Sequence, residues 1–165
     1  MERLPKVCPK CKSPYWNKPR IKGAVSNLRE VGQEMIMTQF ERVSISAQQK
    51  AANRNMNPKD AWDEAAREII GGADTRVKGC PREAFLGLCG EGMVKGIPKK
   101  PYTRSEKNKL YARKAVELLR NNPKFRDDTT KELWNRVLKD LGREKVHHNQ
   151  QMHVVLALWK SNLIQ

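Results

Sequence analysis

The chain has 165 residues, with 33 lysines and arginines against 18 aspartates and glutamates, a formal net charge of +15. This length allows one or two small domains. The apolar runs extend over only a few residues, which excludes a membrane-spanning class and leads us to expect a cytoplasmic protein with no membrane partner. A positive charge of this size favours a polyanionic partner, and we expect that partner to be nucleic acid.

The excess charge is concentrated in two stretches of the chain. Residues 1–22 hold seven lysines and arginines against one glutamate, and residues 98–116 hold the same numbers. Clustered cations attract phosphates by long-range electrostatics and by the release of counterions. We therefore expect both stretches to border a phosphate-binding surface.

The first basic stretch contains a Cys-x-x-Cys pair, Cys8 and Cys11. A tight turn between two such cysteines aims both thiolates at one metal ion, so the pair predicts half of a tetrahedral zinc site. The pattern Cys-Pro-x-Cys-x-Ser-x-x-Trp resembles the second knuckle of a zinc ribbon, but no first knuckle is present. The other ligands could come from a second chain in a homodimer, from a histidine, or from Cys80 with others. We expect the tail of this segment to contact phosphates through Lys10, Lys12, Lys18, Arg20 and Lys22, and Tyr15 and Trp16 to stack on exposed bases.

Residues 1–45 are predicted to form this knuckle and a connection to the rest of the chain. Within the connection, residues 34–40 and residues 43–45 each have the composition of a short strand. We therefore expect a β-hairpin between the knuckle and the first helix.

The remainder contains an internal repeat of three helices. The first unit is residues 46–97, with helices predicted at 46–55, 58–70 and 81–91, and the second is residues 104–165, with helices at 104–121, 130–141 and 149–161. A basic linker, residues 98–103, separates them. Trp62 matches Trp134 at an offset of 72, and each follows a helix start: Asn57-Pro58 in one unit and the capping box Thr129-x-x-Glu132 in the other. A second capping box is predicted at Thr103-x-x-Glu106.

The clearest correspondence lies at the end of each unit, at an offset of 70. Residues 86–94 and residues 156–164 both have an apolar helical pattern, then a residue that tolerates positive φ, then two apolar residues. Gly92 and Asn162 occupy the positive-φ position. This pattern is typical of a helix C-terminus with a left-handed cap and its hydrophobic contact. The fold class is therefore predicted to be mainly α, with two tandem trihelical units.

The ending Leu-x-x-Leu-Trp-Lys-Ser-Asn-Leu-Ile of the second unit resembles the helix-turn-helix superfamily, including winged-helix regulators. That resemblance implies a third helix whose N-terminal end reads base edges in duplex DNA, more readily than in RNA, although a solvated polar helix start is an equal alternative. The residues it assigns to base contact are His148, Asn149, Gln150, Gln151 and His153. The expected phosphate contacts in the helical part are Arg76, Lys78, Arg82, Lys99, Lys100, Arg104, Lys107 and Arg113.

The string from Gly79 to Cys89, with the half of the chain that follows, also resembles an uncharacterised family of small bacterial domains, which implies no activity. It places Cys80 and Cys89 in the helical part, where Cys89 aligns with Trp159 and is expected to be a buried core residue.

No catalytic pattern stands out, because phosphate-binding glycine loops, nucleophile elbows and His-Glu-x-x-His are all missing from the sequence. We therefore expect a non-enzymatic protein that binds nucleic acid. The alternative is a protein-interaction adaptor, such as a defence, antitoxin or phage-type factor, whose basic face meets an acidic partner. A nuclease is a more distant possibility.

Overall fold

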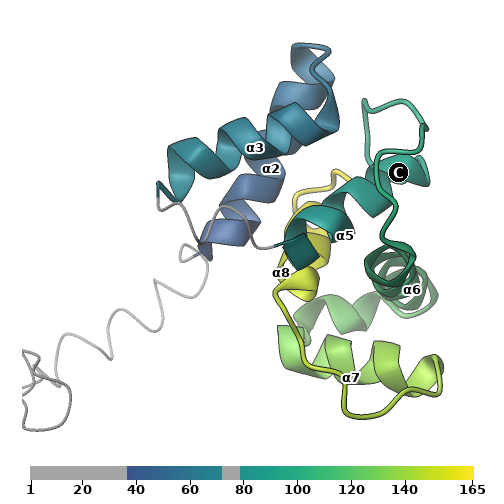
Figure 1. Cartoon of the computed structure of the whole chain (residues 1–165). Helices are drawn as coiled ribbons and strands as arrows, with labels where there is room; N and C mark the ends of the chain where they lie inside the picture. The colour runs from purple at the N-terminus through teal and green to yellow at the C-terminus, as the bar shows by residue number, and fades with distance from the viewer. Residues whose placement is uncertain (1–36, 72–78) are drawn as a thin grey trace, which may run out of the picture. The chain divides into compact units, whose positions relative to one another are not determined.

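The computed structural model describes residues 37–71 and 79–165, and it is mainly α-helical over these residues (Figure 1). This confirms the predicted mainly α class. The described residues contain no strand, only one isolated antiparallel bridge between Val94 and Ile164. The elements, labelled as in Figure 1, are α2 (Gln39–Asn53), α3 (Pro58–Ile69), α5 (Gly79–Gly90), α6 (Glu106–Asn121), the 3₁₀ helix η1 (Pro123–Asp127), α7 (Thr130–Asp140) and α8 (Gln151–Lys160).

The start of α2 corrects the predicted β-hairpin. Thr38 and Glu41 form a capping box: the Thr38 side chain accepts from the Glu41 amide, and the Glu41 carboxylate accepts from the Thr38 amide at 2.5 Å. These bonds satisfy amides that a helix start leaves without partners. Residues 43–45, predicted as a strand, therefore lie inside a helix whose apolar face holds Phe40 and Val43. Residues 34–36 of the predicted hairpin lie outside the described residues.

Two other predicted helix starts are confirmed and one is wrong. Asn57 accepts from the Lys59 amide at 3.0 Å ahead of Pro58, and Thr129 forms a capping box with Glu132. At the start of α6, however, the N-cap is Ser105, which makes no side-chain cap hydrogen bond. The hydroxyl of Thr103, which we expected to cap this helix, accepts from the Ser105 amide instead and donates to Glu83.

The two predicted left-handed caps are present at the ends of α5 and α8. Gly92 has φ of 72° and Asn162 has φ of 55°. In each case the next residue donates its amide back into the helix, from Met93 to the Leu88 carbonyl at 3.0 Å and from Leu163 to the Leu158 carbonyl at 2.9 Å. These are the six-to-one hydrogen bonds of a Schellman motif. The caps return the chain to the core at Val94 and Ile164.

The two returning segments pair with each other. The Lys95 amide donates to the Leu163 carbonyl at 2.9 Å, and the Gln165 amide donates to the Met93 carbonyl at 2.9 Å. At the predicted offset of 70, residue 95 corresponds to residue 165 and residue 93 to residue 163. Exchanging the two segments therefore maps each bond onto the other. The bridge therefore relates the two halves reciprocally.

The centre of the helical part is formed by α5 and α8, which pack against each other. The helix α8 also contacts α2, α6 and α7, and α5 also contacts α3 and α6 (Figure 1). Trp62 and Trp134, which correspond in the predicted repeat, are both buried. Because α8 contacts α2 and α5 contacts α6, the helices before and after residues 98–103 share one core. Over the described residues, no helix has the length and apolar character needed to cross a membrane.

Candidate nucleic-acid interface

Four exposed cations lie within ten residues at the connection from α5 to α6. Residues 98–107, which we call the basic segment, contain Lys99, Lys100, Arg104 and Lys107, all exposed to solvent. None of the four forms an ion pair with a carboxylate among the described residues. Their ammonium and guanidinium groups are therefore available to a polyanion. Phosphates interact most readily with cations that are not already paired.

The basic segment is held in place by hydrogen bonds from the hydroxyl groups of Tyr102 and Thr103. The Tyr102 ring is only 7% exposed, and its hydroxyl donates to the carbonyl of Pro98 at 2.8 Å. Burial, with a smaller contribution from Cys89, raises the pKa of Tyr102, so its hydroxyl remains a donor at neutral pH. The neighbouring hydroxyl of Thr103 donates to the Glu83 carboxylate on α5. These contacts fix the backbone between the cations, which reduces the entropy that the segment would lose on binding.

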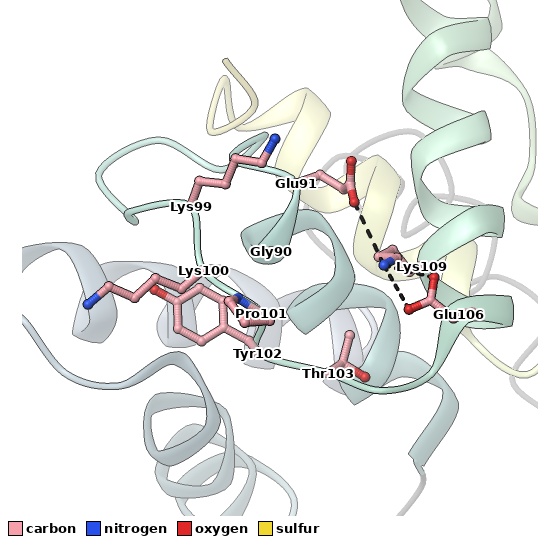
Figure 2. A pocket seen from close by; sticks show the side chains of 9 residues that line it. All are labelled: Gly90, Glu91, Lys99, Lys100, Pro101, Tyr102, Thr103, Glu106 and Lys109. Atoms are coloured by element: carbon pink, nitrogen blue, oxygen red, sulfur yellow. Dashed lines mark hydrogen bonds and ion pairs between the residues drawn. The ribbon is translucent and has the colours of Figure 1, made fainter.

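A pocket of about 500 Å³ opens beside this segment (Figure 2). Figure 2 shows Lys109 between two carboxylates, at 2.8 Å from Glu106 and 3.9 Å from Glu91. Lys109 is therefore neutralised by its neighbours. The carboxylates would repel a phosphate inside the pocket, so the part suited to an anion is its rim, where Lys99 and Lys100 form no ion pair with a described carboxylate. The lining consists of Gly90, Glu91, Lys99, Lys100, Pro101, Tyr102, Thr103, Glu106 and Lys109.

Close packing of α5 against the segment and against α6 depends on glycine. A Cβ atom on Gly90 would lie 3.2 Å from the carbonyl oxygen of Lys100. A Cβ atom on Gly87 would lie only 2.7 Å from the Cα atom of Lys109 on α6. Neither backbone atom can rotate away, unlike the end of a flexible side chain. These two glycines thus let the segment and the start of α6 lie directly on α5.

Two of the expected phosphate contacts are engaged within the protein. Arg82 forms a bidentate pair with Asp63, at 2.9 and 3.1 Å, and a further contact with Glu83. Hydrogen bonding to Asp63 raises the pKa of Arg82. Arg113 lies between Glu91 at 4.0 Å and Glu117 at 3.5 Å. Both arginines join elements of the fold, so their charges are compensated within the protein, unlike those of the basic segment.

The start of α8 contains the residues that were expected to read bases. Gln151 is 3% exposed, and its amide donates to Asn108 on α6 at 3.1 Å. His148 and His153 are half-buried, with their rings 5.5 Å apart, whereas Asn149 is exposed and Gln150 is half-buried with φ of 70°. The remainder of α8 is buried from Val154 to Leu158. A helix enclosed in this way has no free face to insert into a groove, so Gln151 is a core contact and α8 is not exposed as a recognition helix.

The Nε2 atom of His148 has a structural role. It accepts the Met152 amide at 3.1 Å and thereby supplies a partner for one of the first amides of α8. Its ring lies against the Trp134 ring at 5.4 Å between centroids. Burial lowers the pKa of His148 to about 4, with a smaller contribution from His153, so the ring is neutral at pH 7. We therefore treat His148 as a helix cap and not as a base contact.

The expected zinc site and several expected phosphate contacts lie outside the described residues. These are Cys8, Cys11, Lys10, Lys12, Lys18, Arg20, Lys22, Arg76 and Lys78. Within residues 37–71 and 79–165, no three or more histidine, cysteine, aspartate or glutamate side chains are grouped to hold a metal ion. Cys89 is buried as predicted, and burial raises the pKa of its thiol. Cys80 is half-buried at the start of α5.

Three residues that organise the basic segment were not assigned this role from the sequence: Tyr102, Asn108 and Thr103, which was expected to cap α6 instead. The bond from Thr103 to Glu83 spans 20 residues, and the bond from Gln151 to Asn108 spans 43. Sequence patterns report local structure, so contacts of this length leave no trace in them. A weak signal existed at Tyr102, since a tyrosine among prolines and lysines must either stack on a partner or be buried with its hydroxyl bonded.

Comparison with known proteins gives a family but no characterised relative. No curated protein and no solved structure matches this chain. One family model matches, and it covers residues 37–165, a range that begins just before α2 and contains all seven described elements. The chain therefore belongs to a family of unknown function, DUF6979.

Proposed function

We propose that this protein is a non-enzymatic nucleic-acid-binding protein that contacts the phosphate backbone of a duplex with its basic segment. The observation that carries the proposal is the set of four exposed cations on a fixed backbone, Lys99, Lys100, Arg104 and Lys107, with no ion pair to a described carboxylate. Residues 37–71 and 79–165 hold 23 lysines and arginines against 14 aspartates and glutamates, a net charge of +9. The surplus supports attraction of a polyanion from a distance as well as at contact.

The burial of α5 and α8 supports backbone binding in preference to base reading. In helix-turn-helix docking a third helix inserts into the major groove, and here the third helix of each half is enclosed by other helices. Phosphate contacts position a protein but carry no sequence information. We therefore expect similar affinity for duplexes of unrelated sequence.

The placement of the aromatic residues favours a duplex over a single strand. Proteins that bind single strands without sequence preference stack bases on exposed aromatic rings beside their cations. Among the described residues every tryptophan, tyrosine and phenylalanine is buried or half-buried. Duplex DNA remains our preferred partner over RNA, as the helix-turn-helix resemblance implies.

Ion pairing of the carboxylates supports a non-enzymatic role. A nuclease of the metal-dependent kind needs carboxylates that converge on a cation. Asp63, Glu64 and Glu68 on α3, which are the closest to such a cluster in sequence, instead pair with Arg82 or Lys50. Their negative charge is used to join α3 to α2 and α5.

The tandem trihelical architecture forms part of the proposal. In it α2, α3 and α5 correspond to α6, α7 and α8, so that the chain is a pseudo-dimer of two related units. The matching caps at Gly92 and Asn162 and the reciprocal bonds around Val94 and Ile164 support this correspondence. The Cys8 and Cys11 knuckle would add a zinc-stabilised contact, directly or by pairing two chains. Zinc content of the purified protein, before and after substitution of both cysteines, tests that part separately.

The proposal is tested by titrating labelled duplex DNA, duplex RNA and single strands with the full chain while the salt concentration is varied. We expect tight duplex binding that weakens steeply between about 50 and 300 mM salt. Polyglutamate serves as the matched control, because it offers carboxylates at comparable density without a phosphate backbone. Equal competition by polyglutamate, charge for charge, would favour the adaptor alternative. Binding indifferent to salt would refute the proposal.

A further inference from the structure

The start of α8 is connected to the basic segment by a chain of hydrogen bonds. The Gln151 side chain accepts from the Asn149 amide at 2.7 Å and donates to Asn108 at 3.1 Å. Asn108 donates to the Ser105 hydroxyl at 3.0 Å, and the Ser105 amide donates to the Thr103 hydroxyl at 2.9 Å. Thr103 and Ser105 flank Arg104, one of the four free cations. The position of the first turn of α8 therefore bears on the basic segment.

This first turn depends on a neutral histidine. His148 Nε2 can accept the Met152 amide only while that nitrogen carries no proton, since both nitrogens of an imidazolium are donors. A charged ring would also face the positive end of the α8 dipole and a second histidine, His153, stacked at 5.5 Å with an interplanar angle of 25°. The Nδ1 atom of His153 is itself buried without a hydrogen-bond partner among the described residues. Nothing in this stack is arranged to hold an additional positive charge.

We propose that protonation of His148 breaks its hydrogen bond to the Met152 amide and releases the first turn of α8, and we call this proton-sensitive cap the clasp. Through Gln151 and Asn108, the released turn loosens the basic segment. Binding to a phosphate backbone therefore weakens in mild acid. The effect on binding rests on the proposed function, whereas the release of the turn does not. The inference deepens the proposed function by naming a condition that regulates the same surface.

The groups around His148 and His153 do not stabilise a protonated ring, so acid favours release of the first turn of α8. From α2, Glu41 is the one carboxylate that acts on His153, and its attraction is outweighed by burial, so the pKa of His153 is lowered. From α7 the ring of Trp134 faces His148, and from α5 Cys80 shares a pocket of about 330 Å³ with His148 and Asn149. No described carboxylate forms an ion pair with His148 to offset the cost of its protonation.

The size of the effect follows from linkage. With a pKa of about 4 in the closed turn and an ordinary value near 6.5 in the open one, protons favour the open form between these values. Between pH 7 and pH 5 the ratio of open to closed turns would rise by up to about 20-fold. The closed form is favoured at pH 7, so the opening is expressed mainly below pH 6.

Electrostatics alone would give the opposite result. Protonation of exposed histidines adds positive charge and should strengthen binding to DNA as the pH falls. The clasp predicts weaker binding, so the sign of the pH dependence separates the two explanations. Affinity for a labelled duplex is measured from pH 7.5 to pH 5 at constant ionic strength. We expect a several-fold loss for the wild type, and stronger binding in acid would overturn the inference.

Variants identify the group responsible. The substitution His148→Gln supplies a side-chain oxygen as acceptor that does not titrate in this range, and His148→Asn is a second version of the same change. For either folded variant the ratio of affinities at pH 5 and pH 7 should stay level or follow the electrostatic trend. A loss in acid equal to that of the wild type would overturn the role of His148.

Amide hydrogen exchange in the absence of nucleic acid tests the clasp independently of the proposed function. In the wild type the protection factors of the Met152 and Ser105 amides should fall together between pH 7 and pH 5. In His148→Gln both should remain level. A fall at Met152 alone would overturn the coupling to the basic segment, and no fall at either would overturn the clasp. If duplex binding is absent at every pH while both amides respond, the proposed function fails and the clasp stands.

Discussion

Removing the four free cations of the basic segment should flatten the salt dependence of duplex binding. The test variant replaces Lys99, Lys100, Arg104 and Lys107 with glutamine. Each is exposed and forms no ion pair with a described carboxylate, so the substitutions should change the free energy of unfolding by no more than about 0.5 kcal/mol each. A change in binding can then be attributed to the missing charges.

The expected magnitude follows from the number of phosphates that these side chains can neutralise. The slope of log K against log salt is about −0.9 for each phosphate contact on B-DNA, so four contacts contribute about −3.6. Over a fourfold rise in salt this is a loss of roughly 150-fold in affinity that the variant should no longer show. If only two of the four side chains reach phosphates at once, the slope should change by about 1.8.

The assay is fluorescence anisotropy of a labelled duplex of about 20 base pairs, titrated at several salt concentrations near neutral pH. A control variant removes the same charge elsewhere: glutamine replaces Lys124, Lys131 and Lys139, and asparagine replaces Lys145, whose φ is 57°. These four lysines are also exposed and lie on η1, α7 and the following loop. A change in slope below about one unit, or an equal change in both variants, would refute the role of the basic segment.

Other predictions concern the fold that holds this segment. The free energy of unfolding should fall as the pH drops from about 6.5 toward 4, because the folded-state pKa of His148 is depressed and the unfolded state then binds the proton more tightly. Urea unfolding at several pH values should show a loss of about 1–2 kcal/mol, a figure that allows for solvent around a half-buried ring. The variant His148→Gln should lose less over the same pH range. Gly92→Ala should lower the melting temperature more than Gly71→Ala. Both glycines have φ near 70°, but only the new Cβ at Gly92 would approach another residue, Lys99, at 3.2 Å. Equal decreases in melting temperature would contradict this. Gly87→Ala should lower the free energy of unfolding by about 1–3 kcal/mol, because the new Cβ would meet the backbone of α6. Gly79→Ala, where no heavy atom lies within 4 Å of the new Cβ, should leave it unchanged. A tolerated Gly87→Ala would show that α5 and α6 can separate without loss of stability.

Local signals accounted for much of the fold. The bounds of α3 and α7 agree with the sequence-based prediction to within one residue, because Asn57-Pro58 and Thr129-x-x-Glu132 fix helix starts through contacts that span two or three residues. The caps after α5 and α8 were predictable for the same reason. The start of α2 was missed although its capping box is equally local, since the apolar residues around Phe40 have the composition of a strand as well as of a helix face.

The base-reading role predicted for the start of α8 stays a prediction, and the composition of the helix weighs against it. Residues 154–158 are apolar without interruption, and a helix that is apolar on all sides is a buried helix. A recognition helix needs a polar face along its length, whereas here the polar residues lie before and in the first turn and, as Lys160, at the end of the helix. The composition of α8 therefore already indicated burial, and the resemblance to helix-turn-helix proteins drew attention to the polar residues alone. Its contacts with four other helices account for that composition.

The pairing of the two central helices also determines where function can reside. With α5 and α8 enclosed, the groups that can meet a partner lie on the outer helices and on the connections, and charge is unevenly compensated there. Ten of the 14 described carboxylates form ion pairs with described cations, but only eight of the 23 described lysines and arginines do so. Folding thus neutralises most of the negative charge and leaves most of the positive charge free. A protein built only for internal stability gains nothing from that surplus, since unpaired like charges repel one another; an external polyanion is the partner that would make it favourable.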